Sequence, residues 1–355
     1  MGLFSKDRDL TKPPEQIELK VDASALGLKV EDVLIRLDSF LAMHLKWRSR
    51  SSLKTLVKEG WVHVDASTPE RPMGTGELTL EKRSGRKLRH GSRVVVVIPP
   101  DLRQAPIKDV DTNLTVIYED DACLVLEKPA PLAVHATSRY LNDNLILRVH
   151  AKYSDAIAEG RMAPRLCHRL DRETSGAVLV AKTLPAHAEL ARQFEEREVE
   201  KHYFAIVHGE VAAESGSCDH PIGSSRTSTI RLKMACAADG QESRTDWRVV
   251  ERALRFTLLE CELFTGRQHQ IRLHLAALGH SIVGDKLYGD DEMIFQRAAD
   301  DELTEADHAA LLLERHALHH HRLAFTSPST GERVVAMSPL PTVLRDFFDE
   351  RAVKR

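Results

Sequence analysis

The sequence predicts an α+β protein with two domains. Short β runs dominate the chain from about residue 113 onward, and helical stretches such as 184–198, with Leu190 and Phe194 at helical spacing, interrupt them. The part before residue 100 instead reads as two amphipathic helices followed by strands. At 355 residues the chain exceeds a typical single domain, which also favours two.

The domain boundary is predicted from a proline-rich stretch. Pro99 to Pro106 has the composition of a linker. We therefore expect an N-terminal tail at 1–15, a small domain at 16–100, a linker at 101–112 and a larger domain at 113–345.

The small domain is predicted to be a helix-helix-strand module. One amphipathic helix begins at Arg36, a second covers 48–58, and Gly60 ends it. Residues 61–65 alternate as a strand, and a second strand at 93–98 stops at two prolines.

The charge of the chain is unevenly distributed. The formal net charge is -3, yet residues 31–100 contain 13 Lys and Arg against 8 Asp and Glu. The basic residues of the second helix, Arg48, Arg50, Lys54 and Lys58, are candidates for phosphate contacts, or else form an ordinary solvated face. Residues 85–90 add charge or are only an exposed loop. The acidic stretch 290–307 is predicted to be a solvated surface insertion.

Composition argues against several classes of protein. The 42% hydrophobic fraction is typical of a globular protein, and no apolar run approaches the roughly 18 residues of a membrane span. The N-terminus has no signal-peptide core, so we expect a cytoplasmic location. The five cysteines are scattered and never spaced as C-x-x-C, so buried free thiols are expected.

Neither a metal nor a nucleotide cofactor is expected. The cluster of His316, His319, His320 and His321 invites a metal interpretation, but no carboxylate-rich ligand set accompanies it. The glycines between residues 279 and 289 lack the spacing of a phosphate-binding loop.

The segment 168–176, HRLDRETSG, places a carboxylate in a tight polar turn. The apolar run 177–181 follows and is predicted to be a strand buried on both faces, so Asp171 lies at a sheet end. Burying an unpaired carboxylate is costly, so Arg169, Arg172 or a more distant cation should compensate it. A structural Asp-Arg turn is the alternative interpretation.

Several blocks, in order along the chain, resemble the motifs of the RluA-type pseudouridine synthases. They are 116–121 and 124–129 with Val134-His135, then 168–176, Lys201-His202-Tyr203, 265–274 and 279–289. The resemblance covers about residues 114–327 and implies a mixed, largely antiparallel central sheet with flanking helices. Departures from the family pattern are Glu127, Pro131, Cys167 and Ser327. None of the four departures is at Asp171, the residue that the resemblance makes the nucleophile. The resemblance places the first two in a loop near the substrate.

The small domain resembles an RNA-binding domain that a small-subunit ribosomal protein shares with tyrosyl-tRNA synthetases. The resemblance implies RNA as the partner.

The family resemblance also implies roles for site residues. Asp171 is expected to be the nucleophile, which attacks carbon 1 of the ribose or first removes a ribose proton to give a glycal; both routes need an ionised carboxylate. Arg272 pairs with it and lowers its pKa. Tyr203 stacks on the uracil and joins the final proton transfer, the alternative being core packing.

Three further residues are assigned by resemblance. Arg169 is expected to fill the space that the extruded base leaves, and Ile271 to pack under the base. His168 is expected to be a hydrogen-bond partner that stabilises the turn.

The predicted function is isomerisation of specific uridines to pseudouridine in structured RNA, by a cytoplasmic monomer without metal or cofactor. Ribosomal RNA is favoured over transfer RNA because of the N-terminal domain. The alternative is a non-catalytic RNA-binding or ribosome-assembly factor on the same fold. A glycosidic hydrolase would need two carboxylates flanking one bond, and only one is placed here.

Overall fold

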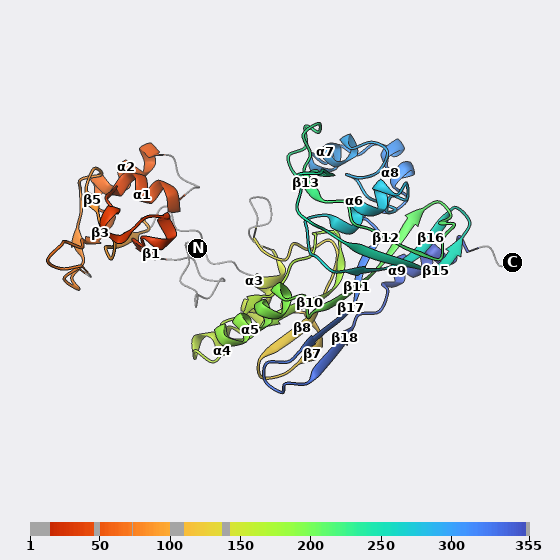
Figure 1. Cartoon of the computed structure of the whole chain (residues 1–355), viewed down its shortest axis with the longest axis horizontal. Coiled ribbons are helices and arrows are strands. Elements are labelled where there is room, and N and C mark those ends of the chain that lie inside the picture. The colour runs from red at the N-terminus through yellow and green to blue at the C-terminus, as the bar shows by residue number, and fades with distance from the viewer. Residues whose placement is uncertain (1–14, 46–49, 73, 100–109, 137–142, 353–355) are drawn as a thin grey trace. The chain divides into compact units, whose positions relative to one another are not determined.

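The computed structural model describes residues 15–45, 50–72, 74–99, 110–136 and 143–352 (Figure 1). The chain divides into two compact units, Met1–Asp109 and Val110–Arg355. The expected tail at 1–15 lies almost entirely outside the described residues, and so does most of the expected linker at 101–112. No helix among the described residues has the length and apolar character needed to cross a bilayer.

The N-terminal unit is a small antiparallel sheet with two helices. Its four-stranded sheet has the order β1-β6-β3-β4, and a separate pair joins β2 to β5. The strands are β1 Gln16–Lys20, β2 Ile35–Arg36, β3 Val62–Asp65, β4 Thr79–Leu80, β5 Lys87–Leu88 and β6 Arg93–Val97. The helices are α1 Leu37–His44 and α2 Arg50–Glu59, with two short 3-10 turns, η1 Ser24–Leu26 and η2 Val30–Asp32.

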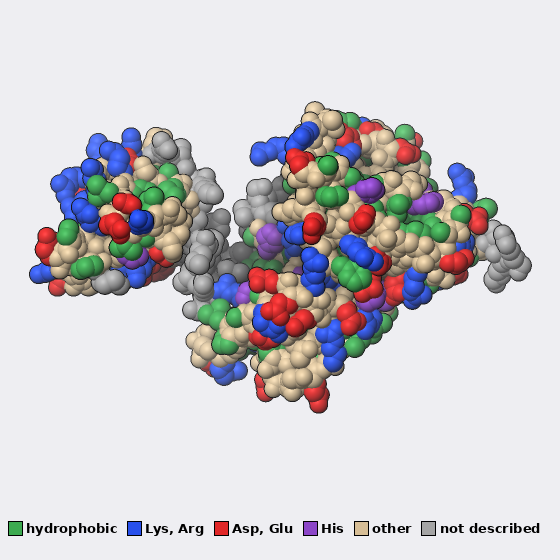
Figure 2. Space-filling view, viewed as in Figure 1, with side chains coloured by type: hydrophobic (Ala, Val, Ile, Leu, Met, Phe, Trp, Pro, Cys, Tyr) green, Lys and Arg blue, Asp and Glu red, His purple; other side chains and the backbone are tan. Residues whose placement is uncertain are grey.

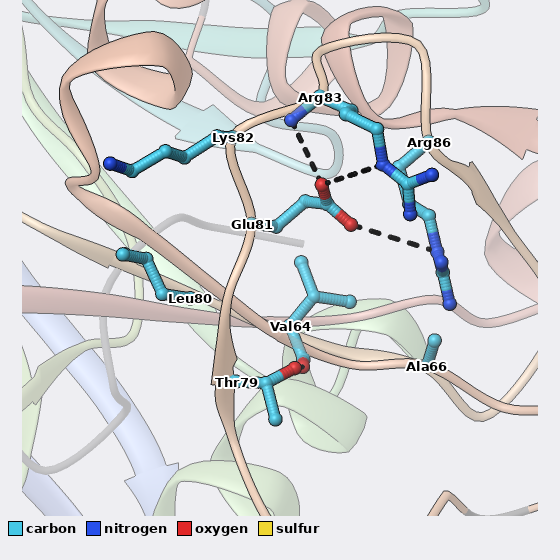
Figure 3. A pocket seen from close by; sticks show the side chains of 8 residues that line it. All are labelled: Val64, Ala66, Thr79, Leu80, Glu81, Lys82, Arg83 and Arg86. Carbon is cyan, nitrogen blue, oxygen red and sulfur yellow. Dashed lines mark hydrogen bonds and ion pairs between the residues drawn. The ribbon is translucent and has the colours of Figure 1, made fainter.

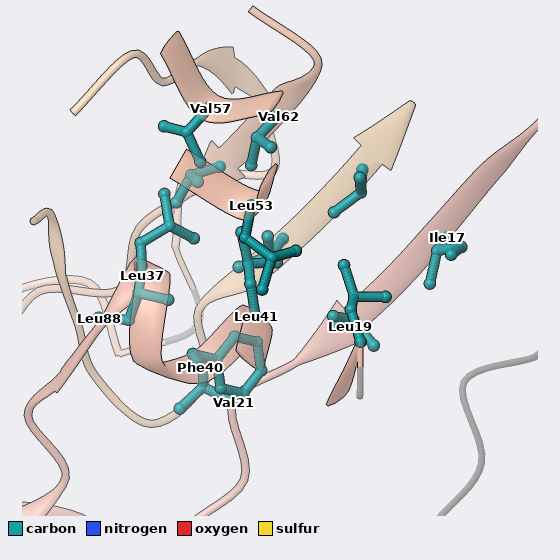
Figure 4. Close-up of a cluster of buried hydrophobic side chains, with 14 of the residues drawn as sticks. Ile17, Leu19, Val21, Leu37, Phe40, Leu41, Leu53, Val57, Val62 and Leu88 are labelled. Carbon is teal, nitrogen blue, oxygen red and sulfur yellow. The ribbon is translucent and has the colours of Figure 1, made fainter. Parts of the chain in front are cut away.

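Apolar side chains from both helices and the sheet form one core in this unit. Leu37 and Leu41 of α1 and Leu53 of α2 are fully buried against Val62 and Leu88 (Figure 4). The apolar positions of α2 recur at helical spacing, which turns Lys54 and Lys58 toward solvent.

The larger unit is built on a ten-stranded sheet. Its main path has the order β12-β15-β16-β11-β17-β10-β8-β7, with β18 added to β17 and β9 to β10. The strands are β7 Thr115–Glu119, β8 Cys123–Lys128, β9 Arg165–Leu166, β10 Ser175–Ala181, β11 Glu200–His208, β12 Ser215–Cys218, β15 Thr245–Ala253, β16 Phe256–Leu263, β17 Leu318–Thr326 and β18 Arg333–Met337. Among the described strands of this sheet, β10 and β17 alone pair in parallel, so the predicted mixed, largely antiparallel sheet is confirmed.

Helices lie on this sheet and at its edges. They are α3 Leu145–Lys152, α4 Ser154–Ala158, α5 Leu184–Glu195, α6 Gln270–Ala277, α7 Met293–Ala299, α8 Glu305–Leu311 and α9 Thr342–Asp349, and a hairpin of β13 Ile222–Ser224 and β14 Met234–Cys236 packs beside α6. In Figure 1, α3 to α5 lie near β8 and β10, whereas α6 to α8 gather around the hairpin. Thr183 caps α5 by accepting a hydrogen bond from the amide of Ala186.

The centre of the sheet depends on one glycine. Gly176 has a φ of +116°, and a Cβ there would lie 2.2 Å from the carbonyl oxygen of His320 on the parallel strand β17. Only glycine allows the two backbones to approach this closely. All seven residues of β10 are buried, which confirms the predicted double-sided burial.

Two sequence expectations are wrong in part. Cys123, Cys218 and Cys261 are buried thiols, but Cys167 is half-buried and Cys236 is exposed on the hairpin. The acidic stretch is not simply a solvated insertion, because it folds into α7 and α8 and buries Ile294 and Leu311. The guanidinium of Arg297 holds it together, with ion pairs of 2.7 Å to Asp291 and 2.6 Å to Asp307.

Candidate active site

The segment with the central carboxylate is a turn between β9 and β10. The amide of Thr174 donates to the carbonyl of Asp171 at 3.1 Å, which closes the turn directly before β10 begins. His168 accepts a hydrogen bond from the amide of Leu179 at 3.0 Å, so its predicted role as a turn-stabilising partner is confirmed. Asp171 therefore has a fixed backbone at the end of a buried strand.

A buried lysine fastens the neighbouring loop to this turn. The ammonium of Lys128, at the end of β8, donates to the carbonyls of Pro129 at 2.9 Å, Leu132 at 2.7 Å and Arg172 at 3.1 Å. The loop that contains the family departure Pro131 is thus tied to the residue directly after Asp171. Burial, with Arg315 nearby, lowers the pKa of Lys128 to about 7.

Asp171 is paired by a cation from a distant part of the chain. Nη1 of Arg272, in the first turn of α6, lies 2.9 Å from Oδ2 of Asp171. The other edge of the same guanidinium meets Asp285, with Nε 2.6 Å from Oδ2 and Nη2 2.8 Å from Oδ1. Side-chain exposure falls from 20% for Asp171 to 7% for Arg272 and 0% for Asp285. Of the two carboxylates, Asp171 is the accessible one.

The charges of this triad decide how Asp171 ionises. Burial works against the carboxylate form, but the charge of Arg272 outweighs it and lowers the pKa of Asp171 to about 2. Asp285 shows the same opposition, and its pKa is also lowered by Arg272 and by backbone amides that donate to its Oδ1. At neutral pH both carboxylates are therefore ionised around one cation.

A histidine and a tyrosine lie next to the triad. Nε2 of His269 is 3.9 Å from Oδ2 of Asp171, and its Nδ1 is 2.9 Å from the hydroxyl of Tyr288. That hydroxyl also accepts a hydrogen bond from the amide of Met234 in the hairpin. His269 stands just before α6 with a φ of +58°, which is unusual for a side-chain-bearing residue. Burial, together with Arg272, lowers its pKa to about 4, so the imidazole is neutral at pH 7.

Tyr203 lies on β11 with one ring face covered. Its ring stacks on His320 with centroids 4.3 Å apart and planes 12° apart. Burial first, and the charge of Asp171 second, raise the pKa of Tyr203 above its ordinary value. Its hydroxyl has no hydrogen-bond partner among the described residues. The nearby Nδ1 of His320 contacts the carbonyl of Ala177 at 2.7 Å.

The histidine cluster has separate structural partners. Nε2 of His316 lies 2.7 Å from the hydroxyl of Thr174, Nδ1 of His319 lies 2.9 Å from the hydroxyl of Ser175, and Nε2 of His321 lies 2.8 Å from Glu260. In the described part of the chain no three His, Cys, Asp or Glu residues come together as a metal site. These histidines instead join β17 to the start of β10 and to β16.

The remaining predicted site residues lie in several parts of the chain, and some lie outside the described residues. Ile271 is 3% exposed in the first turn of α6, and Arg169 is an exposed residue of the turn. Arg48 lies outside the described residues. Lys54 and Lys58 are exposed on α2, in the other unit. Arg50 begins α2, but the direction of its side chain is outside the described features.

Three site residues were not assigned a role from the sequence. Asp285, His269 and Tyr288 all fall within blocks that resemble the family motifs, but only geometry shows that they meet at Arg272 and Asp171. The ion pair of buried Lys286 with half-buried Glu173, 2.9 Å apart, also links two of those blocks. A usable sequence signal was the carboxylate of Asp285 among apolar neighbours, because a buried acid requires a cation.

Comparison with known proteins gives consistent matches. Residues 122–277 match the family model described as RNA pseudouridylate synthase. A protein of Aquifex aeolicus named as an uncharacterized RNA pseudouridine synthase is 35% identical over 92% of this chain and 96% of its own. The ribosomal large subunit pseudouridine synthase D of Nitrosomonas europaea is 36% identical over 91% of this chain and 89% of its own.

A solved structure agrees with the fold. Human RNA pseudouridylate synthase domain containing 1 aligns with a TM-score of 0.51 and 26% identity, over 65% of this chain and 86% of its own.

Proposed function

The chain belongs to the RluA-type family of RNA pseudouridine synthases, and from that premise we propose that Asp171 is its nucleophile and ribosomal RNA its substrate. The assignment of Asp171 as nucleophile rests on one observation, the decrease in side-chain exposure from Asp171 through Arg272 to Asp285. It leaves one ionised carboxylate accessible and fixes its orientation through a buried arginine. A non-catalytic RNA-binding factor would have no need of this arrangement.

The reaction moves one bond within the nucleotide. The bond from uracil N1 to ribose carbon 1 breaks, the base rotates, and a bond from C5 to carbon 1 forms. C5 then loses its proton and N1 gains one, so no atoms are added or removed. Asp171 serves either by attacking carbon 1 or by first removing a ribose proton to give a glycal. Both routes begin with the carboxylate, the form that Arg272 favours.

We propose that Arg272 keeps Asp171 ionised and correctly oriented. Its planar guanidinium has two usable edges, and Asp285 occupies one with two hydrogen bonds while Asp171 receives a single one. The attacking oxygen of Asp171 can therefore leave its partner without releasing the arginine.

We propose that His269 is a positioning residue for the same carboxylate. The Tyr288 hydroxyl accepts from the Met234 amide, which leaves its own proton for Nδ1 of His269. The neutral imidazole then carries its proton on Nε2, the nitrogen 3.9 Å from Asp171. A small movement on RNA binding would bring this N–H into hydrogen-bonding range of Oδ2.

Tyr203, Arg169 and Ile271 are proposed to handle the base. Tyr203 is 6% exposed and His320 covers one face of its ring, so we propose that the opposite face stacks on uracil once RNA is bound. The free hydroxyl of Tyr203 suits a part in the final proton transfer from C5. Exposed Arg169 is suited to stack in the gap that the extruded base leaves, and Ile271 to support the base.

The choice of ribosomal RNA rests on two observations. Several relatives are named as ribosomal large subunit pseudouridine synthase D, including those of Nitrosomonas europaea and Xanthomonas campestris. The chain also has a separate N-terminal unit with Lys54 and Lys58 exposed on one helix, which suits the proposed phosphate contacts of a small RNA-binding domain at 16–100.

The decisive experiment maps pseudouridines across ribosomal and transfer RNA in cells with and without this gene. Loss of one or a few ribosomal sites, restored by the intact gene but not by Asp171→Asn, is the expected result. Loss confined to transfer RNA would contradict the substrate, and restoration by Asp171→Asn would contradict the nucleophile.

A further inference from the structure

The N-terminal unit contains a pocket of about 410 Å³ beside its edge strand β4. Figure 3 shows the eight side chains that line it, from β3, β4 and the loop after β4. They are Val64, Ala66, Thr79, Leu80, Glu81, Lys82, Arg83 and Arg86. A volume of this size falls in the range of small-molecule sites.

The pocket has an apolar floor and a positively charged rim. Val64 and Ala66 of the β3 end and Leu80 of β4 supply the apolar part, while Lys82, Arg83 and Arg86 supply three cations. Glu81 is the one carboxylate among the lining residues, so the pocket keeps an excess of positive charge.

Glu81 orients the two arginines without neutralising the rim. Its Oε1 accepts from the backbone amide of Arg83 at 2.8 Å and lies 3.4 Å from that residue's Nε, and its Oε2 lies 3.8 Å from Nε of Arg86. These contacts use the Nε edge of each guanidinium. The Arg83 side chain remains 74% exposed, so its terminal nitrogens face solvent and are available to a ligand.

Two residues that line the pocket lie close to the end of the basic helix α2. A Cβ at Gly60, directly after α2, would lie 3.4 Å from Leu80 Cδ1 and 3.8 Å from Lys82 Cε. The side chains of Leu80 and Lys82 therefore cover the end of the helix whose last turn carries exposed Lys58. Figure 2 shows Lys and Arg side chains gathered on the visible face of this unit.

The segment that leads into β4 is held in place by a buried carboxylate. The carboxylate of Asp65, buried at the end of β3, accepts from the amides of Thr75 at 2.8 Å and Gly76 at 2.9 Å. Amide donors lower the pKa of Asp65, so the anchor is ionised at neutral pH. These hydrogen bonds fix the backbone shortly before β4, the strand whose Thr79 and Leu80 line the pocket.

We propose that this pocket binds one unpaired nucleotide of the RNA substrate other than the target uridine. The apolar floor suits the base, and the rim suits the phosphates on either side of it. Guanidinium planes also stack on bases, which suits Arg83 and Arg86. The proposal rests on RNA as the substrate of the family and goes beyond the general phosphate contacts of α2.

The test separates occupation of the pocket from attraction to its charge. Thr79→Phe fills the pocket without changing charge, and Leu78→Phe, one residue earlier and outside the lining, is its control. The full-length chain is titrated with two RNA hairpins, one blunt and one with an unpaired 3′ extension. Thr79→Phe should weaken binding of the extended hairpin about tenfold. Binding of the blunt hairpin should not change.

A charge pair completes the design. Arg83→Ala with Arg86→Ala should lower the salt slope by about 1.4, at roughly 0.7 for each lost contact with single-stranded RNA. Arg71→Ala with Lys87→Ala removes the same charge outside the pocket and is the control. Leu80→Trp, at a half-exposed position, is a second filling variant should Thr79→Phe lower the stability of the unit.

Equal affinity of both filling variants and the wild type for the extended hairpin would overturn the proposal, even if the charge pair weakened binding. Pseudouridine formation at saturating RNA is measured in parallel and should be unaffected. Asp171→Asn should lose this activity but bind the extended hairpin as tightly as the wild type. The proposal for the pocket and the proposal for the nucleophile are therefore tested separately.

Discussion

Arg272 and Arg83 carry the same charge in opposite surroundings. The Arg272 side chain is 7% exposed and lies between two carboxylates, whereas the Arg83 side chain is 74% exposed and leaves most of its donors in water. A buried cation is held in one geometry and resists screening by salt, because little water separates it from its partners. An exposed cation contributes affinity that falls as salt rises.

In the proposed division of labour, the larger unit catalyses the reaction and the N-terminal unit binds RNA. In the larger unit, the buried charges of Asp285 and Lys286 have partners within hydrogen-bonding distance, Arg272 and Glu173 respectively. Removing one partner of such a pair leaves an uncompensated buried charge, at a cost of about 3–5 kcal/mol. Pairs with a largely exposed partner, such as Arg83 in its pair with Glu81, are worth about 0–1 kcal/mol. Substitutions in the two units should therefore differ in kind as well as in size.

The largest effect is expected from Asp171→Asn. The substitution removes the nucleophile but keeps the shape of the side chain, so pseudouridine formation should fall by about 10⁴-fold or more. Release of tritium from RNA labelled at C5 of uridine measures the rate. RNA affinity and the thermal unfolding curve serve as controls and should stay close to the wild type. Activity near the wild-type level would remove Asp171 from the centre of the reaction.

A smaller effect, with a distinctive pH profile, is expected from Arg272→Met. In the wild type Arg272 lowers the pKa of Asp171 to about 2, so the carboxylate is ionised throughout the pH range 5 to 8. Without that cation, burial should raise the pKa of Asp171 by about 1 to 3 units. Because the reaction needs the carboxylate, the rate of the variant should fall as the pH is lowered through this raised pKa, while the wild-type rate stays flat.

Arg272→Lys is the matched variant for this experiment. Lysine keeps the charge but cannot reach Asp285 and Asp171 with two edges, so its rate should lie between those of the wild type and Arg272→Met. The fall in its rate at low pH should occur at a pH near that of the wild type. Equal pH profiles for all three proteins would contradict the role of the charge.

The sequence alone predicted most of the fold and part of the site. The strand after Asp171 was predicted because an unbroken apolar run must be buried, and α5 begins at Leu184 as expected. It ends at Glu195 instead of 198, since Arg197 turns the chain with a φ of +61°. For α5, the sequence pattern predicted the first residue of the helix correctly but placed its last residue too far along the chain.

The partners of Asp171 could not be predicted from local pattern, because they lie about one hundred residues away. The guanidinium 2.9 Å from Asp171 is that of Arg272, while Arg172, the next residue along the chain, lies 3.8 Å from Glu173. The resemblance pointed to Arg272, but Asp285 and His269 became site residues only when the fold placed α6 beside the turn. Charge compensation predicts that a cation must exist without saying which one.

A tenfold to 100-fold effect on the rate is expected from His269→Ala. The substitution removes the proposed Nε2–H donor beside Asp171, and a hydrogen bond to a charged group is worth about 1.5–3 kcal/mol. His269→Gln places an amide N–H at a similar reach and should restore much of kcat. Tyr288→Phe should lower the rate less than His269→Ala does. Without the Tyr288 hydroxyl, nothing holds the imidazole proton on Nε2 rather than on Nδ1.

Single-turnover rates distinguish this role from a merely structural one. KM should change little in all three variants of His269 and Tyr288, since RNA contacts are retained. If His269→Gln and His269→Ala lose the same activity, then the imidazole supports the start of α6 without acting on Asp171.

The smallest effect should come from the exposed face of α2. Lys54→Ala with Lys58→Ala removes two exposed cations, so kcat should stay unchanged and the stability of the fold should change little. Only RNA affinity should weaken, and the slope of log affinity against log salt should fall by about 0.7 to 0.9 for each lost phosphate contact. Lys20→Ala with Lys29→Ala, exposed positions of the same unit off this helix, is the control for overall charge. If the test pair and the control lower the slope equally, then the basic residues of the N-terminal unit attract RNA by total charge alone, and α2 is no more than a solvated surface.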